Sequence, residues 1–249
     1  MRAMVLAAGL GTRLRPLTDD RPKALVTVAG RTLLEIALAR LRSAGVIDVI
    51  VNVHHFADMV VDYLAANCNF GMHIEISREP ELLDTGGGLK QAAWFFLQDG
   101  RGNEPFLLHN VDVLSTIDLA SMVRFHQRQG ALATLAVQSR ETSRPLLFDA
   151  NGALCGRRVG HEGKAEMVRD VAAPRAFAFG GIHVISPALL AKLSETDVFS
   201  VITEYLRLAG AGEKILAFRA DEYYWCDLGK PESIAQATRD IAAGVVPGI

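Results

Sequence analysis

Residues 3–30 of the chain read AMVLAAGLGTRLRPLTDDRPKALVTVAG, and this stretch decides the fold class. The apolar run over residues 3–8 predicts a buried strand, which passes directly into a loop of small residues carrying Arg13. Lys23 follows ten positions later. Backbone N–H groups in such a loop bind phosphate oxygens, and a guanidinium adds two parallel donors. The stretch indicates an α/β protein whose first strand ends at a polyphosphate site. A strand-ending turn with solvated arginines and a surface lysine is the alternative interpretation.

Two common phosphate-binding motifs are absent from this stretch. Gly9 and Gly11 resemble the start of the dinucleotide pattern, but Leu14 stands where that pattern needs a third glycine. No glycine-lysine pair in the chain is followed by serine or threonine, which excludes a P-loop. What is left is a loop of backbone amides with arginine and lysine close by.

The composition is that of an ordinary globular protein. Of 249 residues, 50% are hydrophobic and 22% are charged, and the formal net charge is −2. Such a balance gives no global field for nucleic acid, so a bound anion needs a local site. No apolar run approaches the ~20 residues that cross a bilayer, and no membrane partner is expected. The three cysteines are scattered without metal-ligand spacing, which favours free thiols in the cytoplasm.

Apolar strands alternate with amphipathic helices, which predicts a mainly parallel sheet covered on both faces. Strands are expected at residues 3–8, 46–53, 73–77, 105–110, 131–138, 146–149, 153–156, 176–185, 215–219 and 223–227. Helices are expected at residues 32–44, 56–66, 119–129, 187–193 and 201–209, after a glycine turn at residues 86–88 as far as about Leu97, and from Pro231 onward. We expect one domain over residues 1–249, in which residues 140–174 form an inserted hairpin and loop. Asn151-Gly152 predicts a type I′ turn for the hairpin, and residues 157–174 an irregular loop over the site.

Two aspartates follow apolar strands. Asp112 comes two residues after Asn110 at the end of a buried strand, and Asp227 closes an aromatic-rich strand. In open α/β sheets ligands bind beyond the carboxyl ends of the strands, and Mg²⁺ prefers carboxylate and phosphate oxygens. The two acids could converge on one metal ion, although for Asp112 a turn-capping role is the alternative.

The segment DTGGGL at residues 84–89 places three glycines before a predicted helix. Such a turn permits a flat group, such as a base, to approach the backbone closely. A flexible hinge is the alternative.

Taken together and in order, these motifs resemble the sugar-1-phosphate nucleotidylyltransferases. The first segment is specific, because the glycine loop, Arg13 and Pro22-Lys23 coincide at close spacing. The resemblance covers nearly the whole chain and implies a Rossmann-like three-layer αβα fold with a mixed, mainly parallel central sheet. Within the family, the chain is most similar to short bacterial uridylyltransferases that act on N-acetylmuramate 1-phosphate. They share the TGGG segment, the Asn-x-Asp pattern and the segment FGGIHVISP at residues 179–187.

The resemblance also implies roles for individual residues. It implies catalytic roles for Arg13, Lys23 and Asp112, and it implies that Asp112 and Asp227 bind Mg²⁺. The nucleotide is assigned to Leu6, Ala7, Ala8, Gly9, Gly11, Thr12 and Arg13 for its phosphates and to Thr85, Gly86 and Gly87 for its base. The sugar is assigned to Asn110, Gly181, Arg144 and Lys164. Weaker candidates for ligand contact are His54, His55 and Arg158.

The implied partners are a nucleoside triphosphate, preferably UTP, and a sugar 1-phosphate, in a monomer or a dimer. Alternatives are a mannose-1-phosphate guanylyltransferase, a cytidylyltransferase for a phosphorylated alcohol, and a catalytically silent subunit that senses nucleotide sugars. Two departures from the family pattern leave the sugar open. Val111 replaces the usual glycine beside Asp112, and residues 140–174 are longer and more basic than in the uridylyltransferases.

Overall fold

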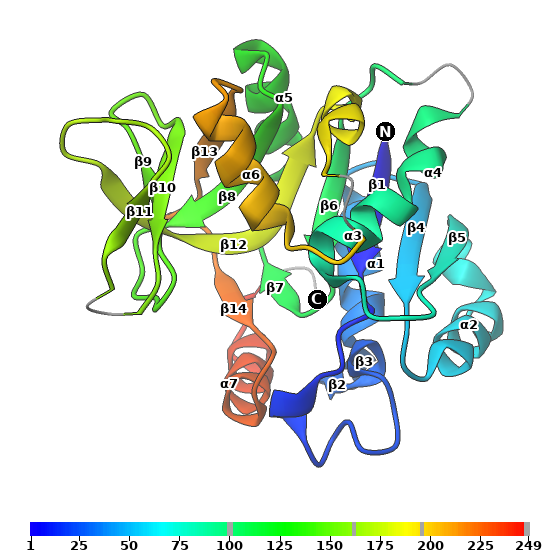
Figure 1. Ribbon diagram of the computed structural model, residues 1–249. Helices are drawn as coiled ribbons and strands as arrows, with labels where there is room; N and C mark the ends of the chain where they lie inside the picture. Colours follow the sequence, from blue (N-terminus) through cyan, green and yellow to red (C-terminus); the bar gives the residue numbers. More distant parts are fainter. Residues whose placement is uncertain (99–101, 161–162, 195–196, 247–249) are drawn as a thin grey trace.

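The computed structural model describes residues 1–98, 102–160, 163–194 and 197–246. A ten-stranded sheet runs through this part of the chain (Figure 1). Its centre is β1 (Arg2–Leu6), which pairs in parallel with β4 (Asp48–Val53) and β6 (Phe106–Asn110). β5 (His73–Arg78) adds a further parallel strand at the edge beyond β4.

Antiparallel strands extend the sheet on its other side. β12 (Arg175–Ile185) pairs antiparallel with both β6 and β8 (Ala133–Gln138). β13 (Ile215–Arg219) then joins β8 in parallel. The prediction of a mixed, mainly parallel central sheet is confirmed.

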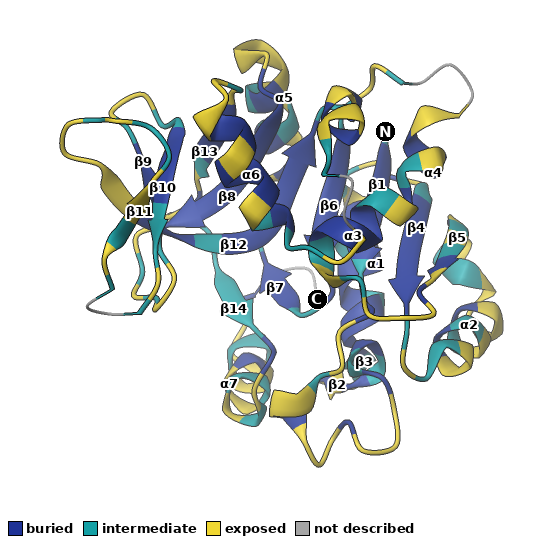
Figure 2. Ribbon diagram, in the orientation of Figure 1, coloured by how far each residue is buried: buried dark blue, intermediate teal, exposed yellow. Residues whose placement is uncertain are grey.

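Helices cover both faces of the sheet and make three layers. One face shares a buried apolar core with α1 (Leu33–Ser43), α2 (Ala57–Ala66), α5 (Leu119–Gln129) and α7 (Pro231–Ala242). The other face packs on α3 (Asp84–Gln91), α4 (Ala93–Leu97) and α6 (Val201–Gly210). The central strands β1, β4, β6 and β8 are accordingly almost wholly buried, whereas β5 and β11 at the edges and the outer surfaces of the helices are more exposed (Figure 2). Burial on both faces is why these strands read as continuous apolar runs.

The start of α1 follows from its sequence. The Thr32 side chain accepts a hydrogen bond from the Glu35 backbone N–H at 3.0 Å, which satisfies one of the free donors at the helix start. Leu34, Leu38 and Leu41 lie on its buried side. This helix agrees with the prediction for residues 32–44 to within one residue at each end.

Three short strands form the insertion, and here two predictions are wrong. β9 (Leu146–Phe148), β10 (Leu154–Arg158) and β11 (Ala165–Met167) make an antiparallel meander, so a strand lies within the predicted loop 157–174. The hairpin turn is not type I′, because Gly152 has φ +79° and Asn151 is not in the positive region. Instead the Asp149 carboxylate accepts hydrogen bonds from the N–H groups of Asn151 and Ala153, both at 2.9 Å. The first residues of β12 pair with β9, so one strand joins the insertion to the central sheet.

Smaller elements complete the chain. β7 (Val113–Ser115) pairs with β14 (Trp225–Asp227), and β2 (Thr27–Val28) pairs with β3 (Arg31–Thr32). The 3₁₀ helices are η1 (Thr12–Leu14), η2 (Lys23–Leu25), η3 (Cys68–Gly71) and η4 (Pro187–Lys192). Within the described ranges, no helix has the length and apolar character that spanning a membrane requires.

Candidate active site

The loop after β1 is held in a tight turn by Gly11. This residue has φ +65°, and a Cβ there would lie 2.9 Å from Thr18 Cγ2 and 3.0 Å from Lys23 Cβ. The Thr18 hydroxyl donates to the Gly11 carbonyl at 2.9 Å, which folds the following segment back over the loop. Gly9 has open space where a Cβ would be. A glycine at position 11 thus brings Lys23 to the loop, and position 9 leaves room for a ligand against the backbone.

Lys23 forms an ion pair with the Asp112 carboxylate. Their side chains are only 12% and 17% exposed, so the pair is largely removed from water. The buried Ala24 anchors η2 in the core directly after Lys23. Residues 89 positions apart therefore meet between the β1 loop and the end of β6.

Asp227 lies next to Asp112 because β14 pairs with β7. In that pairing Asp227 is opposite Val113, and the Leu228 N–H donates to the Asp112 carbonyl at 2.8 Å. The Asp227 carboxylate accepts the Gly229 N–H at 2.8 Å and lies 3.8 Å from Arg13 Nη1. A Cβ at Gly229 would be 2.6 Å from Arg13 Nη2. The glycine two residues after Asp227 therefore makes room for the arginine of the β1 loop.

Two cavities meet at this point. The smaller, of about 420 Å³, is called the loop pocket and is lined by Leu6, Ala8, Gly9, Lys23, Asn52, Glu79, Leu82, Asp84, Thr85, Asn110, Val111, Asp112 and Val198. The larger, of about 660 Å³, is called the arginine pocket and includes Arg13, Asn110, Asp112, Arg140, Arg144, Arg157, Arg158, Gly181, Trp225 and Asp227 in its lining. Asn110 and Asp112 belong to both. Such volumes are typical of small-molecule sites.

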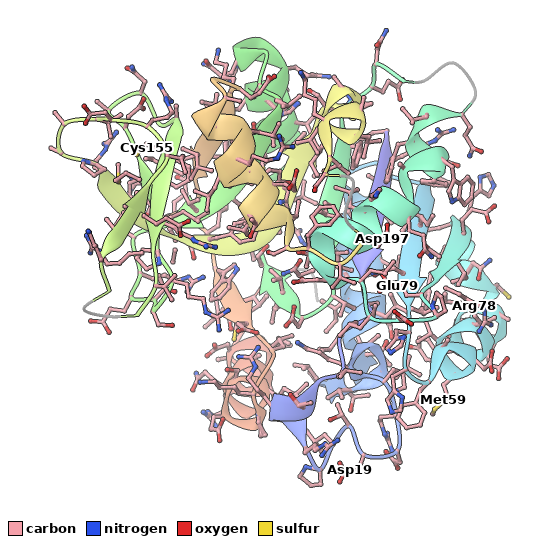
Figure 3. The ribbon with its side chains drawn as sticks, in the orientation of Figure 1. Asp19, Met59, Arg78, Glu79, Cys155 and Asp197 are labelled. Carbon is pink, nitrogen blue, oxygen red and sulfur yellow. The ribbon has the colours of Figure 1, made fainter. Side chains whose placement is uncertain are left out.

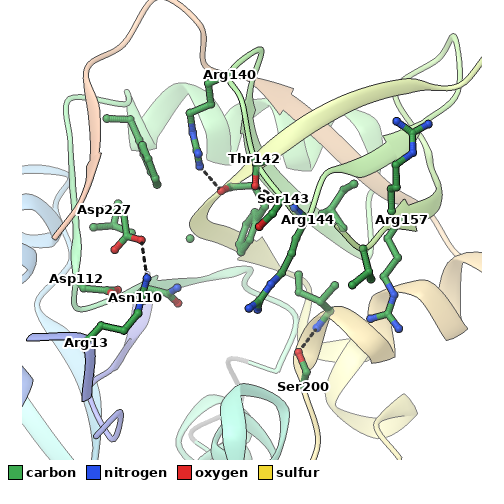
Figure 4. Close-up of a pocket in the computed structure, with 18 residues that line it drawn as sticks. Arg13, Asn110, Asp112, Arg140, Thr142, Ser143, Arg144, Arg157, Ser200 and Asp227 are labelled. Carbon is green, nitrogen blue, oxygen red and sulfur yellow. Dashed lines mark hydrogen bonds and ion pairs between the residues drawn. The ribbon is translucent and has the colours of Figure 1, made fainter. Parts of the chain in front are cut away.

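The arginine pocket has two differently charged sides (Figure 4). Asp112, Asp227 and Arg13 lie together on one side, whereas Arg144 and Arg157 come from the insertion on the opposite side. Gly181 is required within this pocket, because a Cβ there would lie 2.7 Å from Val113 Cγ2 and 3.0 Å from Asn110 Nδ2.

Arg140 is the most firmly held cation of this pocket. Its guanidinium lies 3.5 Å from the Trp225 ring centroid, and its Nη2 donates to the Phe179 carbonyl at 2.8 Å. Burial lowers the pKa of Arg140, and the charge of Asp227 opposes that shift. Its buried Nε has no hydrogen-bond partner among the described residues.

The loop pocket has a buried polar wall that the sequence did not reveal. The Asn52 side chain accepts the Ala7 N–H at 2.7 Å and donates to Glu79 at 2.6 Å. The second Glu79 carboxylate oxygen accepts the Leu83 N–H at 3.1 Å. Asn52 and Glu79 are 2% and 4% exposed, so this network fixes the β1 loop relative to α3. The sequence pointed to neither residue as part of a site. Asn52 lies within a run of apolar strand residues, and Glu79 lies in an acidic segment of the kind that usually covers a surface.

The three glycines of the 84–89 segment lie inside α3, which begins at Asp84, and not in a turn before it. Cβ atoms at Gly86 and Gly87 would lie 2.3 Å from the Phe199 ring and 2.0 Å from the Asp197 carbonyl oxygen. One at Gly88 would lie 2.6 Å from Glu79 Oε1, and both Glu79 and Asp197 flank α3 (Figure 3). These glycines pack α3 against its neighbours, while Thr85 lines the loop pocket.

Other predicted residues lie elsewhere. Lys164 is exposed and does not line either pocket. His54 is outside both pockets and donates from Nδ1 to the Glu79 carbonyl at 2.9 Å, and His55 packs on Phe56. Val111 lines the loop pocket and not the arginine pocket.

Comparison with known proteins gives a consistent result. The family model described as Nucleotidyl transferase matches residues 2–147. The chain is 34% identical to the N-acetylmuramate alpha-1-phosphate uridylyltransferase of Caulobacter vibrioides, over 96% of each protein. It is 30% identical to a probable mannose-1-phosphate guanylyltransferase of Oryza sativa, over 96% of this chain and 64% of that protein. The crystal structure of HddC from Yersinia pseudotuberculosis complexed with GMP-PN has the same fold, with a TM-score of 0.76, 21% identity and coverage of 96% of this chain and 99% of HddC.

Proposed function

This chain belongs to the nucleotidyl transferase family of sugar-1-phosphate enzymes, and we propose that it transfers UMP from UTP to a sugar 1-phosphate, releasing pyrophosphate. The observation that carries the proposal is that two cavities meet at Asn110 and Asp112. A reaction that joins two phosphorylated substrates needs two compartments that converge on one charged point. The loop pocket would hold the nucleotide, and the arginine pocket the sugar.

The chemistry follows from the charges at the junction. An oxygen of the sugar phosphate attacks the α-phosphorus in line, and the bond from that phosphorus to the bridging oxygen of the β-phosphate breaks. Pyrophosphate leaves with that bonding electron pair. A phosphate monoester is already a competent nucleophile, so the protein has to position two anions that repel each other and to stabilise the charge that develops. Arg13 would stabilise the leaving pyrophosphate, and Lys23 would contact phosphates of both substrates.

Asp112 and Asp227 fit a magnesium site that the substrates complete. They are brought together by adjacent strands in one pocket. Mg²⁺ commonly binds through one or two carboxylates plus substrate phosphates. Bound there, Mg²⁺ would neutralise phosphate charge and orient the reacting groups. Lys23 would exchange Asp112 for phosphate oxygens when substrates bind.

N-acetylmuramate 1-phosphate is the proposed sugar substrate. Support comes from the Caulobacter relative, which matches this chain over 96% of both proteins and is named for that activity. The rice relative is named for mannose 1-phosphate and GTP chemistry at 30% identity, which makes that pair the alternative to test.

The test is a matrix of UTP, dTTP, GTP and CTP against N-acetylmuramate, N-acetylglucosamine, glucose and mannose 1-phosphates, with Mg²⁺, scored by pyrophosphate release. We expect release with UTP and N-acetylmuramate 1-phosphate above all other pairs. If release is highest with GTP and mannose 1-phosphate, the chain would instead be assigned as a mannose-1-phosphate guanylyltransferase. Binding without release in every pair would overturn the transferase proposal and favour a silent subunit.

A further inference from the structure

The wall of the arginine pocket carries more positive charge than one phosphate group requires. Five arginines and two aspartates line it among the described residues. Both aspartates and Arg13 lie on the side where the pocket meets the loop pocket, and Arg144 lies across the cavity from them (Figure 4). The surplus cations are therefore on the far side, which the insertion supplies.

Three of the five arginines already have partners. Arg13 lies 3.8 Å from the Asp227 carboxylate, and Arg157 Nε donates to Glu166 at 2.7 Å. Arg140 is stacked on Trp225 and bonded to a backbone carbonyl. The side chains of Arg144 and Arg158, in contrast, form no hydrogen bond or ion pair with any residue that the structure describes. Arg144 is exposed and Arg158 is half-buried.

The 1-phosphate of the substrate cannot be the group that these two arginines serve. Under the proposed function the phosphate has to reach Asp112, where the two pockets join. The sugar ring would then lie in the arginine pocket, which Phe179 also lines, with Arg144 across the cavity from Asp112. Thr142 and Ser143, two further hydrogen-bonding side chains of the same segment, line this far side as well.

We propose that Arg144 and Arg158 form an anion subsite that recognises a second negative group, a carboxylate or a phosphate, on the sugar 1-phosphate. The proposal rests on the proposed function and adds the substrate class. Guanidinium groups bind both anions through two parallel N–H donors. A neutral hexose 1-phosphate would displace water from these two guanidinium groups without supplying a negative group in its place, which costs free energy. The subsite therefore disfavours neutral sugars as well as attracting charged ones.

The test uses pairs of substrates that differ by one charge. One pair is N-acetylmuramate 1-phosphate and the amide of its lactyl carboxylate, which keeps the size of the group. The other is glucose 1,6-bisphosphate and glucose 1-phosphate. We expect wild-type kcat/KM to favour the charged member of at least one pair by about tenfold or more, the fold-change that corresponds to one charge-assisted hydrogen bond. The pair that shows the preference identifies the anion as carboxylate or phosphate.

Variants then assign the preference to these side chains. In Arg144→Gln/Arg158→Gln we expect the charged-to-neutral ratio of kcat/KM to fall to within about threefold of one. The loss should appear mainly in KM for the charged substrate, while kcat/KM for the neutral partner changes less than about threefold. A merely structural role would lower both members equally. Arg128→Gln makes the same kind of substitution, with loss of one charge, at an exposed position on α5 and should leave the ratio unchanged.

Failure of the subsite is distinguishable from failure of the proposed function. Turnover of charged and neutral partners with equal kcat/KM would keep the transferase proposal and overturn the subsite. If no pair releases pyrophosphate, calorimetric binding of the same substrate pairs to wild-type protein and to the double variant decides the matter. A charge preference in binding that the double variant loses supports the subsite, and equal binding of charged and neutral members overturns it.

Discussion

At the scale of single residues, the candidate site depends as much on missing side chains as on charged ones. Gly11 leaves space for the side chain of Lys23, Gly181 for that of Asn110, and Gly229 for that of Arg13. In each case a Cβ would come within about 3 Å of the functional side chain or of a neighbour that supports it. The glycines therefore determine where the functional side chains lie. In each of these cases, a functional side chain or its neighbour occupies the space that a Cβ of the glycine would take.

Arg13 is expected to stabilise charge that develops on the leaving pyrophosphate. Replacing it in Arg13→Ala should cost about 2.7 kcal/mol or more of transition-state stabilisation, a loss of about a hundredfold in kcat, as for removal of one preorganised donor. Arg15→Ala is the matched control, since Arg15 lies in the same loop, is 70% exposed and, among the described residues, pairs only with Asp19. Steady-state pyrophosphate release measures both. A loss below about tenfold in Arg13→Ala would show that Arg13 does not bind the reacting phosphates.

Asp112→Asn should abolish most turnover and leave the fold intact. The side chain keeps its shape, but it loses the charge that pairs with Lys23 and that suits Mg²⁺. Removing a group that stabilises transition-state charge by several kcal/mol lowers kcat by about a thousandfold. Asp58→Asn, which breaks an exposed pair with Arg78, is the control. Turnover near wild type in Asp112→Asn, with unchanged thermal unfolding, would remove Asp112 from the metal and catalytic site.

Some of these residues were predictable and others were not, for a physical reason. Arg13 and Lys23 lie close to Gly11 and Pro22 in the sequence, and Asp112 and Asp227 lie at strand ends, so the local sequence pointed to all four. The local sequence does not point to Arg140, because the position of its side chain depends on stacking against Trp225, 85 residues away, and on a hydrogen bond to the Phe179 carbonyl. A contact between distant segments leaves no local pattern.

At the scale of elements, the helices were predicted best and the insertion worst. α5 was predicted to the residue, because Asp118 caps it and Gly130 ends it in the left-handed conformation. β11 has only three residues and a largely exposed pattern, so periodicity could not distinguish it from a loop. α3 was misjudged because glycine normally disfavours helix interiors, whereas close packing against residues 197–199 requires it here.

The packing of α3 makes a stability prediction. A methyl group at Gly87 would lie 2.0 Å from the Asp197 carbonyl oxygen, which is backbone and cannot rotate away. We expect Gly87→Ala to lower the free energy of unfolding by about 1–3 kcal/mol, despite the better helix propensity of alanine. In Gly102→Ala, where no atom of the described residues lies within 4 Å of the added Cβ, the change should be below about 0.5 kcal/mol. Urea unfolding compares them, and equal effects would contradict the proposed contact.

At the scale of the whole molecule, one long strand connects the two functional halves. β12 pairs with β9 of the insertion through Arg175–Phe177 and with β6 through Ile182–Ile185, and Gly181 between these two parts lines the arginine pocket. Its register shifts between Phe179 and His183, next to Gly181. The sequence predicted this strand and a mixed, mainly parallel sheet, because buried strands are apolar throughout. It could not predict that β12 turns the insertion toward Asp112, since that depends on the shift in register.

Three buried histidines in the layers of this fold predict how its stability depends on pH. His109, His126 and His183 are 1–2% exposed. Burial lowers the pKa of His109 and His126 to about 4, and burial together with the charge of His109 lowers the pKa of His183 to about 3. In the unfolded chain these histidines titrate near pH 6.5. Between these values the unfolded state binds more protons, so the free energy of unfolding falls as the pH falls from about 6.5 toward 4.

The steepest contribution is about 1.4 kcal/mol per pH unit for each histidine. Urea unfolding at several pH values across this window measures the slope for wild-type protein, for His126→Gln and for His73→Gln. His126 lies between Thr134 and Ser186 in the interior, whereas the His73 side chain is 84% exposed. We expect His126→Gln to reduce the slope of the free energy of unfolding against pH by an amount equivalent to close to one proton, whatever its effect on stability at neutral pH. The substitution removes one group that is protonated in the unfolded state and neutral in the folded state within this window. His73→Gln should leave the slope as in wild type, and equal slopes in the two variants would show that the buried histidines do not cause the acid sensitivity.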